Sequence, residues 1–206
     1  MRIEIPPDRP RVEVTLNDGS IAVMSPLLPS DREYMIEGLS EMSLDSRYMR
    51  FGQGRYTLSG KEWTYLTEVD QTNHVAWAAA IDGEGAGVAR FIRFGDDDCA
   101  EVAVTVLDRF QSNGLGTALL LTMVAIARHD RIPALCFEVV PSNTQVREVL
   151  HQLQADLREV DGLIEGRIEP GPHIEVPFED EVLEVMRQVR DSPGFVPPLG
   201  DRPAPG

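Results

Sequence analysis

The chain has few positive charges and no long apolar run. Its 206 residues include 19 Lys and Arg against 34 Asp and Glu, for a formal net charge of -15. This charge repels a phosphate backbone, so we expect a cationic partner and no nucleic acid. The longest apolar stretch, residues 118–127 with Thr122 inside it, is far shorter than the roughly 20 residues of a membrane-spanning helix. We therefore expect no membrane partner.

Cysteine is scarce as well. Cys99 and Cys136 stand apart, without CxxC or Cys-His spacing. This pattern indicates neither a disulfide framework nor a zinc site, and it predicts two free, buried thiols. The four histidines are scattered without a ligand spacing, so no metal is expected and each histidine is interpreted as a surface or core residue. The first ten residues lack the apolar segment of a secretory signal, which predicts a cytoplasmic protein.

The length and the 42% apolar content fit one domain of ordinary size. We expect this single domain to span residues 1–190. Residues 191–206, "DSPGFVPPLGDRPAPG", are too rich in Pro and Gly to pack, and we expect a disordered tail there. The oligomeric state is not predicted.

Hydrophobic patterns predict a mixed α/β (α+β) domain. A helix is expected over residues 29–43, with Ser30 as its cap. Adjacent apolar runs predict antiparallel strands, and the strand–helix–strand order that follows predicts a right-handed crossover. The expected strands are residues 20–24, 74–82, 85–94, 100–107 and 134–140, and the later helices are 115–129 and about 142–154. These elements favour a mostly antiparallel central sheet.

Two of these strands carry one acid each on a face that is otherwise small or apolar. In "AEVAVTVL" one face holds Ala100, Val102, Val104 and Val106, and the other holds Glu101, Ala103, Thr105 and Leu107. Glu138 has the same alternation in "ALCFEVV". If the strands are neighbours, burial and mutual repulsion would raise one carboxylate pKa toward that of a general base. The alternatives are a bond from Glu101 to Arg90 or Arg93, and a basic partner for Glu138.

The segment "FQSNGLGTALL" sets a glycine turn directly before a helix. A helix N-terminus presents free N–H groups and partial positive charge, and glycine lets the backbone approach a bulky anion, so this turn is suited to phosphate. A Walker loop would need lysine after Gly116, and the dinucleotide fingerprint would need glycine or alanine at Leu119. What remains is the pattern Gln111-Ser112-Asn113-Gly114-Leu115-Gly116. The alternative is a turn that only caps the helix.

At these residues the sequence resembles the GNAT superfamily of acetyltransferases. The resemblance runs from about residue 100 to 153, with Gln111, Gly114 and Gly116 at the signature positions of the acetyl-CoA loop. Asn143 matches the asparagine that often begins the next helix. The resemblance implies a GNAT-like sheet with helices on both faces and two neighbouring strands that part to admit acetyl-CoA. It also implies that the pyrophosphate meets the loop and that the pantetheine arm meets the strand backbone. The implied cofactor-binding residues are Val104, Val106, Gln111, Ser112, Asn113, Gly114, Leu115, Gly116, Thr117 and Asn143.

A second stretch of sequence resembles one particular group within this superfamily. "MSLDSRYMRF" is similar to a segment of bacterial protein lysine acetyltransferases, matched here at Ser43, Ser46, Tyr48, Arg50 and Phe51. We take Tyr48, Arg50 and Glu138 as candidate acceptor-binding residues; the alternative for Tyr48 and Arg50 is that they only anchor the segment through a hydrogen bond and a salt bridge. "AEVAVTV" is similar to a strand whose glutamate, here Glu101, takes the proton from the acceptor amine.

The implied reaction needs a base, because a lysine amine with a pKa of about 10.4 is almost wholly protonated at neutral pH. We expect Glu101 to supply it during direct transfer of acetyl from acetyl-CoA to a protein lysine, with no covalent intermediate. Two alternatives remain: a small-molecule amine as the acceptor, and an acyl-CoA sensor without turnover. The sensor is considered because no tyrosine lies between residues 145 and 155, where much of the superfamily carries the group that protonates the thiolate.

Overall fold

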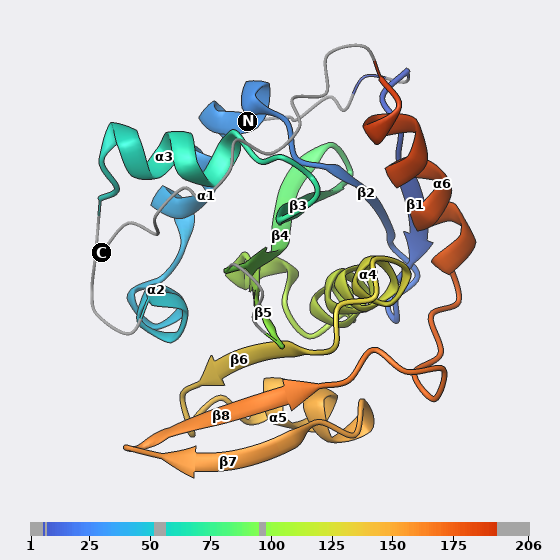
Figure 1. Ribbon diagram of the computed structural model, residues 1–206. Helices are drawn as coiled ribbons and strands as arrows, with labels where there is room; N and C mark the ends of the chain where they lie inside the picture. The colour runs from blue at the N-terminus through green and yellow to red at the C-terminus, as the bar shows by residue number, and fades with distance from the viewer. Residues whose placement is uncertain (1–5, 7, 52–56, 95–97, 193–206) are drawn as a thin grey trace.

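The computed structural model describes residues 6, 8–51, 57–94 and 98–192 (Figure 1). Eight strands form one sheet in the order β1-β2-β3-β4-β5-β6-β8-β7. Their bounds are β1 Val12–Thr15, β2 Ile21–Pro26, β3 His74–Ile81, β4 Glu84–Arg93, β5 Ala100–Val106, β6 Leu135–Val139, β7 Asp156–Val160 and β8 Leu163–Ile168. All neighbours are antiparallel except β5 and β6, which are parallel. The predicted mixed, mostly antiparallel sheet is thus confirmed.

Helices cover both faces of the sheet, as predicted. Their bounds are α1 Arg32–Glu41, α2 Leu44–Phe51, α3 Gly60–Thr67, α4 Leu115–His129, α5 Thr144–Gln152 and α6 Glu179–Arg190. Figure 1 shows α1, α2 and α3 on one side of the sheet and α4 and α6 on the other. Helix α4 contacts β4 and β5, and α6 contacts β1 and β2. One face of the sheet therefore packs against α4 and α6, and the other face lies toward α1, α2 and α3.

The core lies between the sheet and α4. This helix is apolar on nearly all sides, which is typical of a helix enclosed by other elements. Strand β3 is also buried along most of its length, because helices cover both of its faces. The side chain of Trp77 is fully buried, and its indole N–H donates to the sulfur of Met186 in α6 at 3.3 Å.

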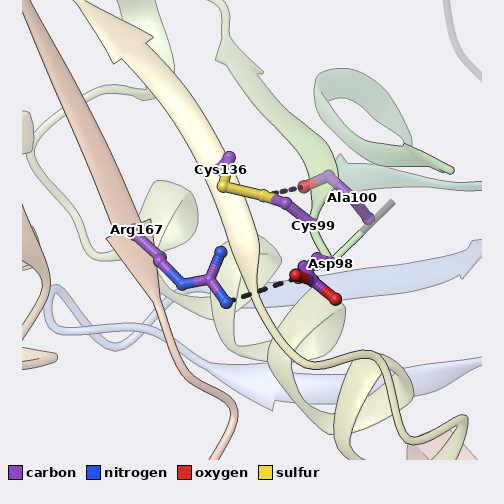
Figure 2. Close-up of a disulfide and its surroundings, with 5 residues drawn as sticks. All are labelled: Asp98, Cys99, Ala100, Cys136 and Arg167. Carbon is purple, nitrogen blue, oxygen red and sulfur yellow. Dashed lines mark hydrogen bonds between the residues drawn. A yellow bond between two sulfur atoms is a disulfide. The ribbon is translucent and has the colours of Figure 1, made fainter. Parts of the chain in front are cut away.

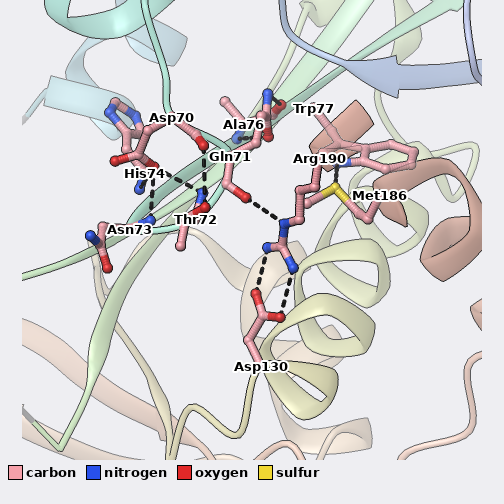
Figure 3. Close-up of polar contacts among 10 residues, drawn as sticks. All are labelled: Asp70, Gln71, Thr72, Asn73, His74, Ala76, Trp77, Asp130, Met186 and Arg190. Carbon is pink, nitrogen blue, oxygen red and sulfur yellow. Dashed lines mark hydrogen bonds and ion pairs between the residues drawn. The ribbon is translucent and has the colours of Figure 1, made fainter. Parts of the chain in front are cut away.

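Charged side chains hold α6 in place (Figure 3). Arg190, at the end of α6, donates to both carboxylate oxygens of Asp130, at 2.8 and 2.6 Å, and to the carbonyl oxygen of Gln71 at 2.9 Å. Asp130 ends α4. The guanidinium of Arg190 therefore binds Asp130 in a bidentate arrangement. Its third hydrogen bond connects the end of α6 to the turn before β3.

Two local predictions are wrong. Ser30 is not the cap of the first helix: it lies in the short 3-10 turn Pro29–Asp31, and α1 begins at Arg32 with Asp31 at its cap. The chain turns there because the Asp31 carboxylate accepts from the Leu28 N–H at 2.9 Å and pairs with both terminal nitrogens of Arg9.

Cys99 and Cys136 are not free thiols, because they form a disulfide (Figure 2). Their Cα atoms are 5.9 Å apart, which is within the range for such a bond. Sequence spacing gave no sign of the pairing, because the two residues are brought together only by the parallel pairing of β5 with β6. Of the predicted tail, the residues beyond Ser192 lie outside the part of the chain that the structure describes.

Candidate active site

Strands β5 and β6 pair over a short distance and then part. Their register contains two pairs, Ala100 with Leu135 and Glu101 with Cys136. Beyond Glu101 the rest of β5 remains paired with β4 only. The sheet thus opens between β5 and β6 on the carboxyl side of Glu101.

The backbone of β5 presents hydrogen-bonding groups to this gap. The N–H of Ala100 donates to Ala134 on the β6 side, and the N–H of Leu107 donates to Ala86 on the β4 side. Because successive residues of a strand point in opposite directions, the N–H and C=O groups of Val104 and Val106 face the gap. An extended chain with amide groups, such as a pantetheine arm, fits such an edge.

The glycine turn leaves the first turn of α4 open. Gly114 stands at the N-cap in a left-handed conformation with φ of 95°, and no side chain caps the helix from this position. A Cβ at Gly114 would lie 3.0 Å from Nδ2 of Asn17. The N–H groups of Gly116 and Thr117 have no acceptor within the helix. These two groups, at the positive end of the helix dipole, fit a pyrophosphate.

Two residues of the predicted loop have structural partners. Leu115 is fully buried, and its N–H donates to Oδ1 of Asn113 at 3.1 Å. The Asn113 carbonyl accepts from the N–H of Asn17 at 2.9 Å. Asn113 therefore stabilises the turn itself. Ser112 has φ of 65° and accepts from Nε2 of Gln145 at 3.0 Å, so the turn is also held from the side of α5.

Gln111 and Asn143 are similarly engaged. Gln111 Nε2 donates to the carbonyl of Val106 at 3.1 Å and lies 3.4 Å from Oγ of Ser46. Asn143 is the N-cap of α5, and its side chain accepts from the N–H of Val146 at 3.3 Å. The prediction that Asn143 begins the helix is therefore confirmed, while contact of either side chain with a cofactor stays a prediction.

The structure separates the two predicted acids. Glu101 and Glu138 point to the same face, since Glu101 lies opposite Cys136 and Glu138 follows by two residues. However, Glu138 lies opposite Glu165 of β8, on the far side of the gap. Both side chains are exposed, so the expected burial of the two carboxylates is wrong. Glu101 alone lies at the point where β5 and β6 part.

A buried polar cluster lies on the same face as Glu101. Arg90 donates to the Leu66 carbonyl and to Nε2 of His74, both at 3.1 Å. Burial, with the charge of Arg90 beside it, lowers the pKa of His74 to about 3. The ring is therefore neutral at physiological pH. Because Arg has no acceptor, Nε2 of His74 accepts and its proton is on Nδ1. The burial of its side chain confirms the prediction that His74 is a surface or core residue and places it in the core.

Tyr65 of α3 completes this cluster, and sequence reasoning missed it. Its ring centroid lies 5.1 Å from that of His74. Burial raises the pKa of the Tyr65 phenol; Arg90 opposes the shift, and the charge of Glu101 adds to it. The strand residues of this cluster could have been found from the sequence, because His74, Arg90 and Glu101 lie on one face once the three strands are paired in register. Tyr65 itself lies on a helix, so strand alternation could not reveal it.

A pocket of about 130 Å³ lies between this sheet face and helices α1 and α3. Its walls are mostly apolar and include Tyr34, Met42 and Trp63, while Thr105 and Arg90 line its sheet side. Thr105 belongs to the β5 face on which space was predicted. Tyr48 and Arg50 lie in α2, but their side chains are outside the described part of the structure.

The described residues contain no group of three or more His, Cys, Asp or Glu that could hold a metal ion. Within the same residues, no helix has the length and apolar character needed to cross a membrane.

The gap between β5 and β6, the glycine turn and the open start of α4 together suit an extended ligand that carries a pyrophosphate. The model of the acetyltransferase (GNAT) family matches residues 36–154. The chain therefore belongs to the GNAT family of acetyltransferases, whose members take the acetyl group from acetyl-CoA. The predicted resemblance is confirmed.

Individual relatives agree with this assignment. Acetyltransferase Pat of Mycolicibacterium smegmatis is 30% identical over 185 residues, which cover 88% of this chain and 54% of that protein. The chain thus spans about half the length of this curated relative. The GNAT domain of S. lividans PAT has a TM-score of 0.73 at 30% identity, over 81% of this chain and 99% of that one. The yncA structure from Salmonella typhimurium with its cofactor acetyl-CoA shares the fold, with a TM-score of 0.62 at 15% identity over 75% of this chain and 96% of that one.

Proposed function

We propose that this chain transfers acetyl from acetyl-CoA to the side-chain amine of a protein lysine, with Glu101 as the general base. The observation that carries the proposal is the position of Glu101 at the point where β5 and β6 part. The exposed carboxylate can reach an amine directly or through one water. The similarity to proteins named Pat, and the net charge of -15, support a basic protein acceptor.

Each group of this chain in the site would have its own role in the reaction. Backbone groups of Val104 and Val106 would hold the pantetheine arm, and the N–H groups of Gly116 and Thr117 would receive the pyrophosphate. Glu101 would take a proton from the ammonium group of the acceptor, which makes the nitrogen lone pair available for attack. The N–H of Val104, which faces the gap, would stabilise the oxyanion that develops at the carbonyl. When this intermediate collapses, the carbon–sulfur bond breaks, and the coenzyme A thiolate leaves and takes up the second proton that the nitrogen loses.

Substitution of Glu101 by Gln tests the base. We expect kcat for a basic peptide with one lysine to fall by about 10²- to 10⁴-fold, because a positioned base contributes roughly this much. The dissociation constant for acetyl-CoA, measured by calorimetry, should not change. Glu165→Gln is the matched control, since it removes one exposed carboxylate from β8, on the far side of the gap. Unchanged turnover in Glu101→Gln would show that Glu101 is not the base.

The same assay separates the alternative functions. Release of the coenzyme A thiol with the peptide but not with spermidine supports a protein acceptor, and the reverse supports a small amine. Acetyl-CoA binding without thiol release in the presence of either acceptor would favour a sensor. The boundaries of the domain at residues 1 and 190, and a cytoplasmic location, remain proposals.

A further inference from the structure

Asp108 joins two segments that are far apart in the sequence. It begins the turn Asp108–Phe110 that follows β5. Its carboxylate accepts from the N–H and the hydroxyl of Ser43, both at 2.9 Å, and from the hydroxyl of Ser46 at 2.5 Å. The partners are 65 and 62 residues away along the chain. Three hydrogen bonds to one carboxylate thus attach the start of α2 to the end of β5.

Ser43 also caps α2. The hydroxyl of Ser43 accepts from the N–H of Ser46 at 3.1 Å, as an N-cap side chain does. Burial alone would raise the pKa of Asp108, but the hydrogen bonds from Ser46 and Ser43 outweigh it and lower the pKa. The carboxylate is therefore held in its charged, accepting form. We call Ser43, Ser46 and Asp108 the Ser-Asp clasp.

The clasp lies between the two halves of the candidate active site. On one side Gln111, at a signature position of the glycine turn, lies 3.4 Å from Ser46 and donates to the carbonyl of Val106. On the other side Met42, directly before Ser43, lines the pocket beneath α1. The clasp therefore connects the wall of the pocket with the strand end and turn proposed to bind acetyl-CoA.

We propose that the Ser-Asp clasp is a positioning device that fixes α2, and with it the acceptor side of the site, relative to the acetyl-CoA loop. Its kinetic consequences rest on the proposed function. None of the three side chains takes part in the chemistry. Loss of the clasp should move α2 rather than the glycine turn, because the turn has its own anchors in Asn17 and Gln145.

Asp108→Ala is the principal variant. We expect KM for the basic lysine peptide to rise roughly tenfold, since hydrogen bonds to a charged group are lost. The dissociation constant for acetyl-CoA should change less than twofold. Asp108→Asn should retain most of the peptide affinity, because its amide can still accept from the Ser43 N–H and donate to Ser46. Asp45→Ala removes a neighbouring, exposed charge from the same turn of α2 and is the control.

Two further measurements test the clasp without relying on a simple loss of activity. Ser46→Ala combined with Asp108→Ala should be non-additive in KM, because both variants break the same unit. Amide hydrogen exchange in residues 44–51 should accelerate at least tenfold in Asp108→Ala, while α4 keeps the protection it has in the unmodified protein.

The outcomes are distinguishable. Unchanged hydrogen exchange in α2 of Asp108→Ala would overturn the proposed role of the clasp, whether or not the protein transfers acetyl. Additive effects of the two variants, or weaker acetyl-CoA binding with an unchanged peptide KM, would also overturn it. If the unmodified protein releases no coenzyme A thiol with any acceptor, the proposed function fails, and hydrogen exchange alone then decides the clasp.

Discussion

Glu101 lies directly opposite Cys136 in the last pair formed by β5 and β6. Cys136 is bonded to Cys99, two residues before Glu101 in the sequence. The disulfide (Figure 2) therefore joins β6 to the residue before β5 at the end where the proposed base is located, and β5 and β6 are unpaired beyond Glu101. The proposed base thus occupies the fixed end of the opening.

The disulfide predicts a stability that depends on reductant. The bond closes a loop with a sequence separation of 37, for which the chain-entropy model gives about 4 kcal/mol of stabilisation. Urea unfolding with and without dithiothreitol should show a loss of up to about this size. The double variant Cys99→Ser with Cys136→Ser should match the reduced protein and should not respond to dithiothreitol. Equal stability of the untreated and reduced protein would contradict a stabilising role for this bond.

The conformation of Gly114 predicts that its substitution by alanine weakens cofactor binding. Alanine at φ of 95° is strained, and its Cβ would lie 3.0 Å from the Asn17 amide. We expect Gly114→Ala to lower the free energy of unfolding by about 1–2 kcal/mol and to weaken acetyl-CoA binding at least tenfold as the turn shifts. Calorimetry and urea unfolding measure the two effects.

Gly162→Ala is the matched control for this prediction. Gly162 also has a positive φ, 82°, but a Cβ there would meet nothing within 4 Å. It lies in the turn between β7 and β8, away from the glycine loop. This variant should lose a similar stability while its acetyl-CoA affinity stays the same. Equal effects of both substitutions on affinity would show that Gly114 has no special role in binding.

The centre of the fold could be predicted because its local and long-range signals agree. Residues 100–153 combine a strand, a glycine turn, an apolar helix and a second strand, and the structure confirms each of them. The hairpin of β7 and β8 was missed. Most residues of β7 are exposed, so the alternation of apolar and polar residues that marks a half-buried strand is weak there.

The candidate site was predicted in part, and the failures have a physical cause. The place of Glu101 on one face of β5 could be predicted because the alternation of a strand is a local property; its role as the base stays a proposal. The contact between Ser43 and Asp108 could not be found in the same way, since serines before a helix are already explained as local caps. The pairing of Cys99 with Cys136 likewise depends on strand register, which the spacing of two cysteines does not encode.

His74 predicts a specific pH dependence of stability. Its pKa is lowered to about 3 in the folded protein by burial and by Arg90, whereas an unfolded histidine titrates near 6.5. The unfolded chain therefore binds a proton first as the pH falls. The contribution of His74 is complete above about pH 6.5 and is lost between about pH 6.5 and pH 3, with a slope of at most about 1.4 kcal/mol per pH unit.

His74→Gln tests this dependence. Glutamine keeps an oxygen that can accept from Arg90 but does not titrate, so its free energy of unfolding should fall less steeply between pH 6.5 and pH 4.5 than that of the unmodified protein. Other groups also titrate there, and the difference between the two slopes isolates His74. His151→Gln, at an exposed position on α5, is the control for the removal of a histidine as such. Parallel curves for all three proteins would show that His74 does not resist protonation, and the neutral hydrogen bond to Arg90 would then be incorrect.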